Sequence, residues 1–427
     1  MEIIKNASPD SPKLNLVTLA QAKISKSGIK REDETMKPTN SILSGYGVTV
    51  FETMSRLAVE AAAINLGQGF PDDNGPENLR HFAANAIIEG PNQYPPMLGI
   101  PELRQAVANH NKRFYGLDVD WQTETMVTSG ATEALTDCIL ALIEPGDEVV
   151  MIEPLYDCYL PMVRRAGGIP KLVRVEPPNW DLPFDSLEKA FSKKTKMILF
   201  NSPQNPAAKV YSPDELKFIA DLIIQYDAYA VCDEVYEHIV YDGLKHIPLM
   251  SLPGMRDRCV RIGSAGKTFS MTSWKVGYMT APAHLLGAIA KAHQFVTFTT
   301  PTNLQHAVAM GLEQEDSYFT GLKATQEAKR NLISAQLEQA GFKTLKTSGT
   351  YFLSADIRSV GFENGDVAFC KDIIRKAGVA AIPLSAFYQN GGPAHFVRFC
   401  FCKHDNVLTE AAKRLKRQFA LDERNIQ

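Results

Sequence analysis

Residues 125–152, TMVTSGATEALTDCILALIEPGDEVVMI, alternate between an apolar strand, a helix and a second strand. The first four residues form a short apolar run, and the small residues Ser129-Gly130-Ala131 open the next segment. In that segment apolar side chains recur at i, i+3, i+4 and i+7, the spacing of one helix face, at Leu135, Cys138, Ile139 and Leu142. A Pro-Gly pair ends the helix before the next run. This order predicts an α/β fold in which helices cover a mostly parallel sheet.

The same alternation extends from about residue 80 to residue 330. Further strands are predicted at 196–200, 228–232 and 259–262, and Ser212-Pro213-Asp214-Glu215 predicts a capped helix start. Beyond residue 330, strand-like runs at 349–355 and 396–401 alternate with amphipathic helices. We therefore predict a large domain and a smaller α+β domain. The predicted limits are an N-terminal extension (1–45), the N-terminal part of the small domain (46–80), the large domain (81–329) and the C-terminal small domain (330–427).

The composition is typical of a globular protein without affinity for polyanions. Hydrophobic residues make up 45% of the 427 residues and charged residues 22%, which is enough apolar surface for a large core. Lys and Arg number 45 against 48 Asp and Glu, a net charge of −3, so neither nucleic acid nor an anionic membrane is an expected partner. The apolar runs are far shorter than the roughly 20 residues that cross a bilayer.

The N-terminus and the cysteines predict a cytoplasmic protein. The start, MEIIKNASPD, lacks the basic residues and apolar stretch of a secretory signal. The seven cysteines are odd in number, and most lie in apolar runs, so reduced thiols are expected. Cys400 and Cys402 are close in sequence, but no second Cys or His pair accompanies them, and no metal site is expected there.

Polar residues follow the carboxyl ends of several predicted strands. These residues are Ser129, Asn201, Asp233 and Ser264. In open α/β sheets ligands bind at this edge. The sequence therefore predicts a binding site at the carboxyl ends of the central strands.

Lys267 lies among small residues in Ser264-Ala-Gly-Lys-Thr-Phe-Ser270, directly after a predicted buried strand. Apolar surroundings disfavour the ammonium form and lower the pKa of a lysine, which allows its free amine to attack a carbonyl. Lys267 is therefore a candidate for a Schiff base with a carbonyl compound. The alternative is an ordinary surface lysine.

Asp233 and Arg398 are charges within apolar segments. Asp233 ends the run Ala-Tyr-Ala-Val-Cys232 and needs a cationic partner, such as a protonated pyridine nitrogen, if it does not cap a following helix. Arg398 stands alone in Phe396-Val-Arg-Phe399 and suits the bidentate capture of a carboxylate, either of a ligand or of an internal acidic side chain.

The start of the predicted helix after Gly130 offers an anion site. Its free N–H groups and the helix dipole attract anions, and the Thr132 hydroxyl adds a donor. Ser264 and Lys275 could complete a phosphate site with Ala131 and Thr132. A small-residue turn before a helix is also common without any ligand.

Several blocks of the chain, taken together, resemble one known family. The blocks are Asn65-Leu-Gly-Gln-Gly-Phe-Pro-Asp72, Asn92-Gln-Tyr-Pro95, Asn201-Ser-Pro-Gln-Asn-Pro206, Cys232-Asp-Glu-Val-Tyr236, Ser264-Ala-Gly-Lys-Thr-Phe-Ser270, Trp274-Lys-Val-Gly277, Gly349-Thr-Tyr-Phe352 and Val397-Arg-Phe-Cys400. From about residue 51 to its end, the chain resembles the fold-type I aminotransferases that use pyridoxal 5′-phosphate. Within them it resembles the kynurenine aminotransferase group, with glutamine transaminase K and methionine aminotransferases, and also the N-succinyldiaminopimelate aminotransferases.

The resemblance implies the fold and the roles of the cofactor-binding residues. It implies a large domain with a mostly parallel seven-stranded sheet between helices, and a smaller α+β domain. Lys267 would hold the cofactor as a Schiff base and move the proton during catalysis. The other implied cofactor contacts are Asp233 at the pyridine nitrogen, Tyr236 and Asn205 at the ring hydroxyl, Asn201 on the same face, Tyr156 stacked on the ring, and Ala131, Thr132, Ser264 and Lys275 at the phosphate.

The resemblance also implies the substrate contacts and a partner. Arg398 would bind the substrate α-carboxylate with the help of Asn205 and the backbone at Gly69, and Phe51 would line the substrate pocket. Tyr94 would reach the phosphate of the neighbouring subunit, which implies a homodimer with shared active sites.

These roles predict an aminotransferase with a ping-pong mechanism. It would move the amino group of an L-amino acid (apolar, aromatic, sulfur-containing, Gln or kynurenine-like) to a 2-oxo acid. The alternatives are a cysteine-S-conjugate β-lyase and an N-succinyldiaminopimelate aminotransferase. A cofactor-binding DNA regulator is disfavoured, because the segment before Phe51 is short for a winged module and the chain is slightly acidic.

Overall fold

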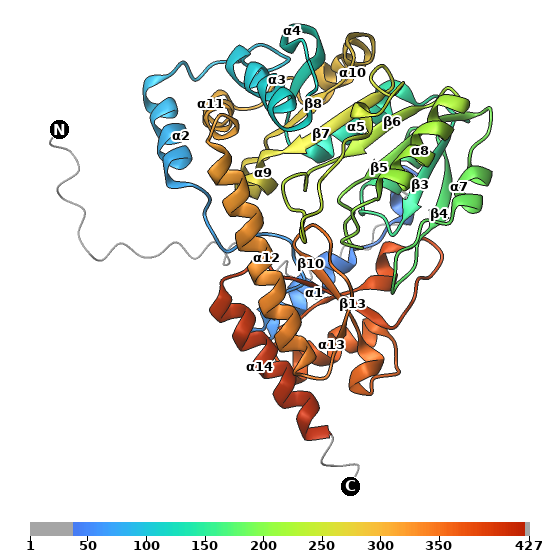
Figure 1. The fold of residues 1–427 in the computed structure, drawn as a ribbon, viewed down its shortest axis with the longest axis vertical. Helices are drawn as coiled ribbons and strands as arrows, with labels where there is room; N and C mark the ends of the chain where they lie inside the picture. The colour runs from blue at the N-terminus through green and yellow to red at the C-terminus, as the bar shows by residue number, and fades with distance from the viewer. Residues whose placement is uncertain (1–36, 423–427) are drawn as a thin grey trace, which may run out of the picture. The chain divides into compact units, whose positions relative to one another are not determined.

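The computed structural model describes residues 37–422, shown in Figure 1. The α-helices of this part are α1 (Val50–Glu60), α2 (Glu77–Glu89), α3 (Pro101–Tyr115), α4 (Trp121–Glu124), α5 (Ala131–Leu142), α6 (Tyr159–Arg165), α7 (Phe184–Ala190), α8 (Pro213–Gln225), α9 (Ala265–Thr268), α10 (Ala283–Val296), α11 (Thr302–Leu312), α12 (Asp316–Glu338), α13 (Asp366–Lys376) and α14 (Asp405–Asp422). The strands are β1 (Ile64–Asn65), β2 (Thr125–Thr128), β3 (Glu148–Glu153), β4 (Ile169–Arg174), β5 (Thr195–Asn201), β6 (Tyr229–Asp233), β7 (Cys259–Ser264), β8 (Gly277–Thr280), β9 (Lys343–Thr344), β10 (Phe352–Asp356), β11 (Val379–Ala380), β12 (Ile382–Pro383) and β13 (Phe396–Cys400).

Seven strands form the main sheet, in the order β2-β8-β7-β6-β5-β3-β4. The pairs from β7 through β6, β5 and β3 to β4 are parallel, and β8 pairs antiparallel with both β7 and β2. The prediction of an α/β fold with a mostly parallel sheet is therefore confirmed.

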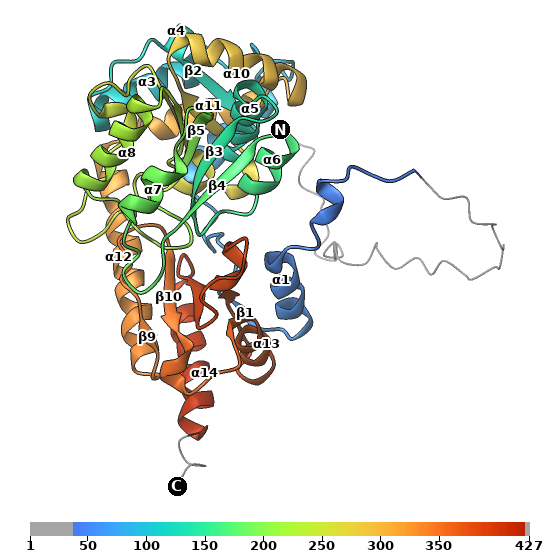
Figure 2. The same ribbon diagram turned by 90° about the vertical axis from the view of Figure 1, so that its right-hand side faces the viewer.

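Helices cover both faces of this sheet, and the strand sequences explain why. Neighbouring residues of a strand point to opposite faces. Val149 and Met151 pack with α5 and α10, whereas Val150 and Ile152 pack in the core that includes α8. Because both faces are buried, the strands are continuous apolar runs rather than alternating ones. Figure 2 shows α7 and α8 on one side of the sheet and α5 and α6 on the other.

The helix starts agree with the sequence. Ser212 caps α8 by accepting a hydrogen bond from the Glu215 amide, and the Glu215 carboxylate accepts one from the Ser212 amide, as the capping box predicts. Gly130 precedes α5 with a φ of 85°, a left-handed conformation that favours glycine. This turn directs the start of α5 toward the carboxyl ends of the strands.

A second sheet, in the order β12-β13-β10-β9, is antiparallel throughout. Arg398 on β13 lies opposite Ser354 on β10 and Ile382 on β12. Figure 1 shows α13 beside this sheet, and α12 running toward it from the seven-stranded part. β1 pairs in parallel with β11, so residues 64–65 lie beside the C-terminal segment.

One strand starts later than predicted. The run 349–355 was expected to be extended throughout, but β10 begins at Phe352. Thr350 has a φ of 64°, which interrupts the extended backbone, and Gly349 instead forms an isolated bridge with Val240. Most of the predicted extension lies outside the described residues, and the four domain limits remain predictions. Among the described residues, no helix is both long enough and apolar enough to cross a membrane.

Candidate active site

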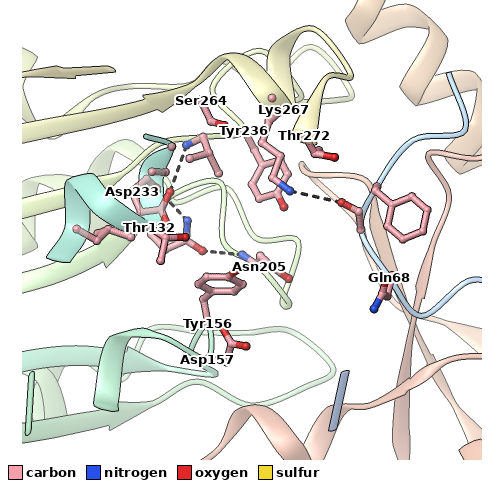
Figure 3. Close-up of a pocket in the computed structure, with 18 of the residues that line it drawn as sticks. Gln68, Thr132, Tyr156, Asp157, Asn205, Asp233, Tyr236, Ser264, Lys267 and Thr272 are labelled. Carbon is pink, nitrogen blue, oxygen red and sulfur yellow. Dashed lines mark hydrogen bonds between the residues drawn. The ribbon is translucent and has the colours of Figure 1, made fainter. Parts of the chain in front are cut away.

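A cavity of about 380 Å³ lies at the carboxyl ends of the central strands. All of the predicted site residues except Tyr94 line it: Phe51, Gly69, Ala131, Thr132, Tyr156, Asn201, Asn205, Asp233, Tyr236, Ser264, Lys267, Lys275 and Arg398. Figure 3 shows Asp233, Ser264 and Lys267 on the side of the seven-stranded sheet, with Gln68 across the cavity from them.

Strand register brings the polar strand ends together. Asn201 at the end of β5 lies directly opposite Asp233 at the end of β6. The side-chain Nδ2 of Asn201 donates to the backbone carbonyl of Asp233 at 2.9 Å. The side-chain Oδ1 of Asn201 accepts a hydrogen bond from the backbone N–H of Asn205 at 2.8 Å. Parallel strands that end at one edge thus align their terminal side chains, as the sequence predicted.

Asp233 is a buried carboxylate without a cationic partner in ion-pair contact among the described residues. Its Oδ2 accepts a hydrogen bond from the Tyr159 hydroxyl at 2.5 Å, and its Oδ1 accepts a long one from the Val235 amide. Burial raises the pKa of Asp233 above its ordinary value, although these hydrogen bonds and Lys267 act in the opposite direction. No helix follows β6 directly, so Asp233 does not cap one.

Lys267 lies in α9, just after β7, and lines the cavity on the side of the seven-stranded sheet. Its Nζ donates to the Tyr351 hydroxyl at 3.0 Å and contacts the Gly69 carbonyl at 3.4 Å. Burial lowers the pKa of Lys267, as the sequence predicted from apolar surroundings. The lysine therefore loses its proton more easily than a surface lysine would.

The start of α5 and Lys275 form a cationic cup. A Cβ added to Gly130 would lie 3.2 Å from Lys275 Cε and 3.3 Å from its Nζ, so the ammonium group lies against the helix start. Among the described residues, no carboxylate pairs with Lys275. Ala131, Thr132 and Ser264 line the same part of the cavity. N–H groups of the first helical turn, a hydroxyl and an ammonium group together match a phosphate.

Arg398 is a fully buried cation on β13, 1% exposed, and lines the cavity on the side of the four-stranded sheet. Its guanidinium donates to Asn205 Oδ1 at 2.8 Å and to the Gly67 carbonyl at 2.7 Å, while its Nε has no partner. No carboxylate of the described residues lies within ion-pair distance of it. Burial lowers the pKa of Arg398 to about 10. The hypothesis of an internal acidic partner is therefore not supported, and the site is suited to a carboxylate from outside.

Aromatic rings enclose this guanidinium. Its carbon lies 3.8 Å from the centre of the Phe352 ring, 5.0 Å from that of Phe387 and 5.4 Å from that of Phe51. Tyr156 and Tyr236 line the cavity between the two walls, and Tyr236 meets Tyr351 edge to face. The backbone contact of Arg398 is Gly67, whereas the carbonyl of Gly69 faces Lys267.

Tyr94 lies away from the cavity of its own chain. Its side chain is 82% exposed, and its ring meets the Phe298 ring edge to face, at 5.5 Å between centres. The contact of Tyr94 with a second subunit stays a prediction.

Sequence reasoning missed several residues of the cavity. Tyr159 donates to Asp233, Tyr351 contacts Lys267, and Phe352 stacks on Arg398. Gln68, Phe70, Asp157 and Thr272 also line the cavity. Tyr351 and Phe352 lie in the block Gly349-Thr-Tyr-Phe352. Their contacts with Lys267 and Arg398 join segments that are far apart in the chain, and a local sequence pattern does not reveal such contacts.

A family model described as aminotransferase class I and II matches residues 61–415. The chain belongs to this family. It is therefore a pyridoxal 5′-phosphate-dependent aminotransferase, as the resemblance predicted. The described residues fit that cofactor, because the cationic cup matches a phosphate and the uncompensated Asp233 carboxylate matches a protonated ring nitrogen.

Curated relatives and solved structures agree with the family. A probable N-succinyldiaminopimelate aminotransferase of Mycobacterium tuberculosis is 42% identical over 388 residues, 88% of this chain and 98% of the relative. The methionine aminotransferase of Escherichia coli is 39% identical over 376 residues, 88% of this chain and 97% of the relative. The solved structure of the M. tuberculosis N-succinyldiaminopimelate aminotransferase superposes with a TM-score of 0.87 at 42% identity, covering 89% of this chain and 100% of that one.

Proposed function

We propose that this aminotransferase moves the amino group of an L-amino acid with an uncharged apolar, aromatic or sulfur-containing side chain to a 2-oxo acid, in a ping-pong cycle. The observation that carries this proposal is Arg398, a buried guanidinium without a carboxylate partner among the described residues and with a free Nε. A buried charge is costly until it is paired, and the α-carboxylate common to amino acids and 2-oxo acids pairs with it.

The residues that line the cavity on the side of the seven-stranded sheet would hold the cofactor. Ala131, Thr132, Ser264 and Lys275 would hold its phosphate, Asp233 its ring nitrogen, Asn205 and Tyr236 its ring hydroxyl, and Tyr156 and Asn201 would contact its ring; all of these residues line the cavity. Lys267 Nζ would be the amine that holds the cofactor's aldehyde. When bound, the cofactor supplies a cationic ring that withdraws electrons from the substrate Cα.

Lys267 would then act as the general base and acid. Once the substrate amine has released Nζ, its lowered pKa would leave it able to take up and give back the Cα proton. The Tyr351 hydroxyl and the Gly69 carbonyl fix the position of Nζ through hydrogen bonds. Arg398 holds the substrate carboxylate from the opposite wall, so that Cα faces the lysine.

The preference for uncharged side chains follows from the cations of the cavity. Its lining cations are Lys267, Lys275 and Arg398, and each already has a role. The remaining wall is rich in aromatic side chains, including Phe51, Phe70 and Phe352. A substrate side chain with its own carboxylate would therefore lose its hydration without gaining an ion pair.

The test is a product screen with the purified holoenzyme. Pooled L-amino acids are incubated with several 2-oxo acids, and the products are identified by mass spectrometry. We expect oxo acids from methionine, aromatic amino acids, glutamine or kynurenine. Exclusive use of acidic amino donors would contradict the proposal. Release of pyruvate and ammonia from a β-substituted cysteine without any 2-oxo acid would instead identify a β-lyase.

A second candidate substrate is N-succinyl-diaminopimelate, which the 42% identical relative from M. tuberculosis favours. The distal carboxylate of this substrate needs a further cation. Arg56 lines an adjoining cleft that shares Phe51 and Gln68 with the cavity, but Glu52 and Glu60 line it too. Including this substrate in the screen, with Arg56→Ala as a variant, separates the two candidates. A loss confined to N-succinyl-diaminopimelate would support the second candidate.

We also infer a homodimer with shared active sites. The surface near Tyr94 is apolar, since Ile88 is 80% exposed, Tyr94 82% and Phe295 83%. The Thr302 hydroxyl contacts the Gln93 carbonyl, which links this segment to α11. An exposed apolar surface of this kind suits a second copy of the chain.

Mixing two inactive variants tests this inference. A Tyr94→Ala protomer keeps its own Lys267, and a Lys267→Ala protomer keeps its own Tyr94. If Tyr94 serves the partner's site, hybrid dimers contain one intact site, and an equimolar mixture regains about a quarter of the wild-type activity. No gain on mixing, with hybrid dimers shown by native mass spectrometry, would contradict shared sites.

A cytoplasmic location is part of the same proposal. All seven cysteines are free thiols, which favours a reducing compartment. Fractionation of the source cells, followed by detection of the protein with an antibody, tests it. Recovery outside the cytoplasmic fraction would contradict this part of the proposal.

A further inference from the structure

A buried cluster of three ionisable side chains lies outside the cavity. Glu133 and Asp137 are one turn apart on α5, and His293 lies on the adjoining α10. Their ligand atoms all lie within 4.8 Å of one another. His293 Nδ1 is 2.7 Å from Glu133 Oε1 and 3.7 Å from Asp137 Oδ2. None of the three lines the cavity.

Asp137 has no hydrogen-bond partner among the described residues. Both of its carboxylate oxygens are buried, and the residue is 0% exposed. A buried carboxylate without a donor is costly, so the position calls for a proton or a cation. Its Oδ2 faces the His293 ring, which places the free carboxylate inside the cluster.

Hydrogen bonds outside the cluster orient the other two groups. His293 Nε2 lies 3.0 Å from the Met97 carbonyl and must donate its proton to that oxygen. Nδ1 shares a proton with Glu133 Oε1 in the metal-free cluster, and once that proton is lost its lone pair is available to a metal ion. The second Glu133 oxygen, Oε2, accepts a hydrogen bond from the Ser129 amide. Metal-binding histidines are typically oriented by such a carbonyl contact.

Charge balance points to a divalent ion. Once a metal ion has displaced the protons of the cluster, a neutral His293 and two ionised carboxylates carry two negative charges, which a divalent ion balances. A nitrogen and two carboxylate oxygens match the ligands of Zn²⁺, which accepts a water molecule as its fourth ligand.

A second cluster, His110, Glu237 and His238, shows why the first is the better site. Glu237 already accepts hydrogen bonds from Tyr115 and Arg261. The Arg261 guanidinium, 3.0 Å from Glu237, would also repel a cation. Asp137, in contrast, has no competing partner among the described residues.

We propose that Glu133, Asp137 and His293 bind one divalent ion, Zn²⁺, which joins α5 to α10. The His293 ring links this site to the Met97 carbonyl through its Nε2. Because α5 begins at the cationic cup, this ion would stabilise the helix whose start faces the cavity. It is a structural ion and takes no part in proton transfer.

The experiment measures zinc binding to the cofactor-loaded enzyme after removal of any affinity tag. Zinc content is determined by elemental mass spectrometry after equilibration with Zn²⁺ and desalting, and affinity by competition with a fluorescent indicator. We expect one zinc ion per chain. Asp137→Asn keeps the side-chain volume and should weaken binding by about tenfold or more. The matched control is His238→Asn, in the second cluster, which should leave zinc binding unchanged.

Two results would overturn the proposal: a wild-type chain that retains no zinc, or Asp137→Asn protein that binds zinc as tightly as the wild type. If Asp137→Asn does not fold, the wild type loaded with Co²⁺ decides the question. Visible absorption bands of four-coordinate cobalt with nitrogen and oxygen ligands support the site, and their absence, or their loss in His238→Asn, rejects it.

Discussion

The two walls of the cavity differ in the way they present charge. The wall from the seven-stranded sheet carries many polar groups at strand ends and at a helix start, among them Asp233, Ser264 and Lys275. The wall from β13 and its neighbours carries one cation, Arg398, among the rings of Phe51, Phe352 and Phe387. The first wall suits a ligand with several fixed polar groups, and the second a carboxylate attached to a variable apolar group.

Each wall also holds one buried charge without an oppositely charged partner in contact among the described residues. Asp233 is 5% exposed and Arg398 1% exposed. Hydrogen bonds from Tyr159 to Asp233, and from Arg398 to Asn205, reduce the cost of burial but do not neutralise either charge. The comparison indicates that a cationic ring and an anionic substrate group complete the site from outside.

The largest expected effect is at Lys267, the residue that links the two walls. Lys267→Ala should reduce turnover on the order of 10⁴-fold, since general acid–base catalysis is lost. The variant should also lack the visible absorbance of the bound cofactor, and borohydride should not label it. Lys291→Ala, at an exposed position, is the control. Borohydride labelling of a different lysine in the wild type would refute the assignment.

A change in the charge of the first wall should have the next largest effect. Asp233→Asn should retain cofactor but lower kcat on the order of 10²- to 10³-fold, because the ring nitrogen is no longer kept cationic. Absorbance titration measures binding, and steady-state rates measure turnover. Asp366→Asn, another buried carboxylate but outside the cavity, controls for stability. Near-normal kcat in Asp233→Asn would remove Asp233 from this role.

The corresponding change in the second wall should affect substrates uniformly. Arg398→Ala should raise KM by about tenfold to a hundredfold for every amino donor, because all donors share the α-carboxylate. The measurement is a set of KM values for donors with different side chains. A rise for one donor alone would show that Arg398 recognises a side chain instead.

The smallest effect is expected at Tyr159, whose hydroxyl donates a hydrogen bond to the Asp233 carboxylate. Tyr159→Phe removes a hydrogen bond to the carboxylate, so the pKa of Asp233 should rise further above its ordinary value. The inactive form with a protonated Asp233 would then persist to higher pH, so the acidic limb of the plot of kcat/KM against pH should shift to higher pH. An unchanged profile would mean that this hydrogen bond does not tune Asp233.

Local patterns predicted the first wall better than the second. The run before Asp233 and the small residues around Lys267 are visible in the sequence, and parallel register brings such strand ends together. The contacts of Lys267 with Tyr351 and of Arg398 with Gly67 join residues 84 and 331 positions apart. No periodicity links such positions, so Tyr351 and Phe352 were missed as site residues.

The cluster of Glu133, Asp137 and His293, for which we propose zinc binding, shows the same limit. Glu133 and Asp137 have helical spacing, but their partner His293 is 160 residues away from Glu133. Only the packing of α10 on α5 brings the histidine beside the carboxylates. The absence of a close His and Cys pattern therefore did not exclude a metal site of this kind.

Apolar periodicity and turn residues, which are properties of neighbouring positions, were sufficient to determine the α/β class, the main strands and the polar edge. The second wall, the pairing of the buried charges and the cluster around Asp137 were decided by tertiary structure. The physical reason is that burial and electrostatic contact depend on distance in space, and packing alone sets that distance for segments far apart in the chain.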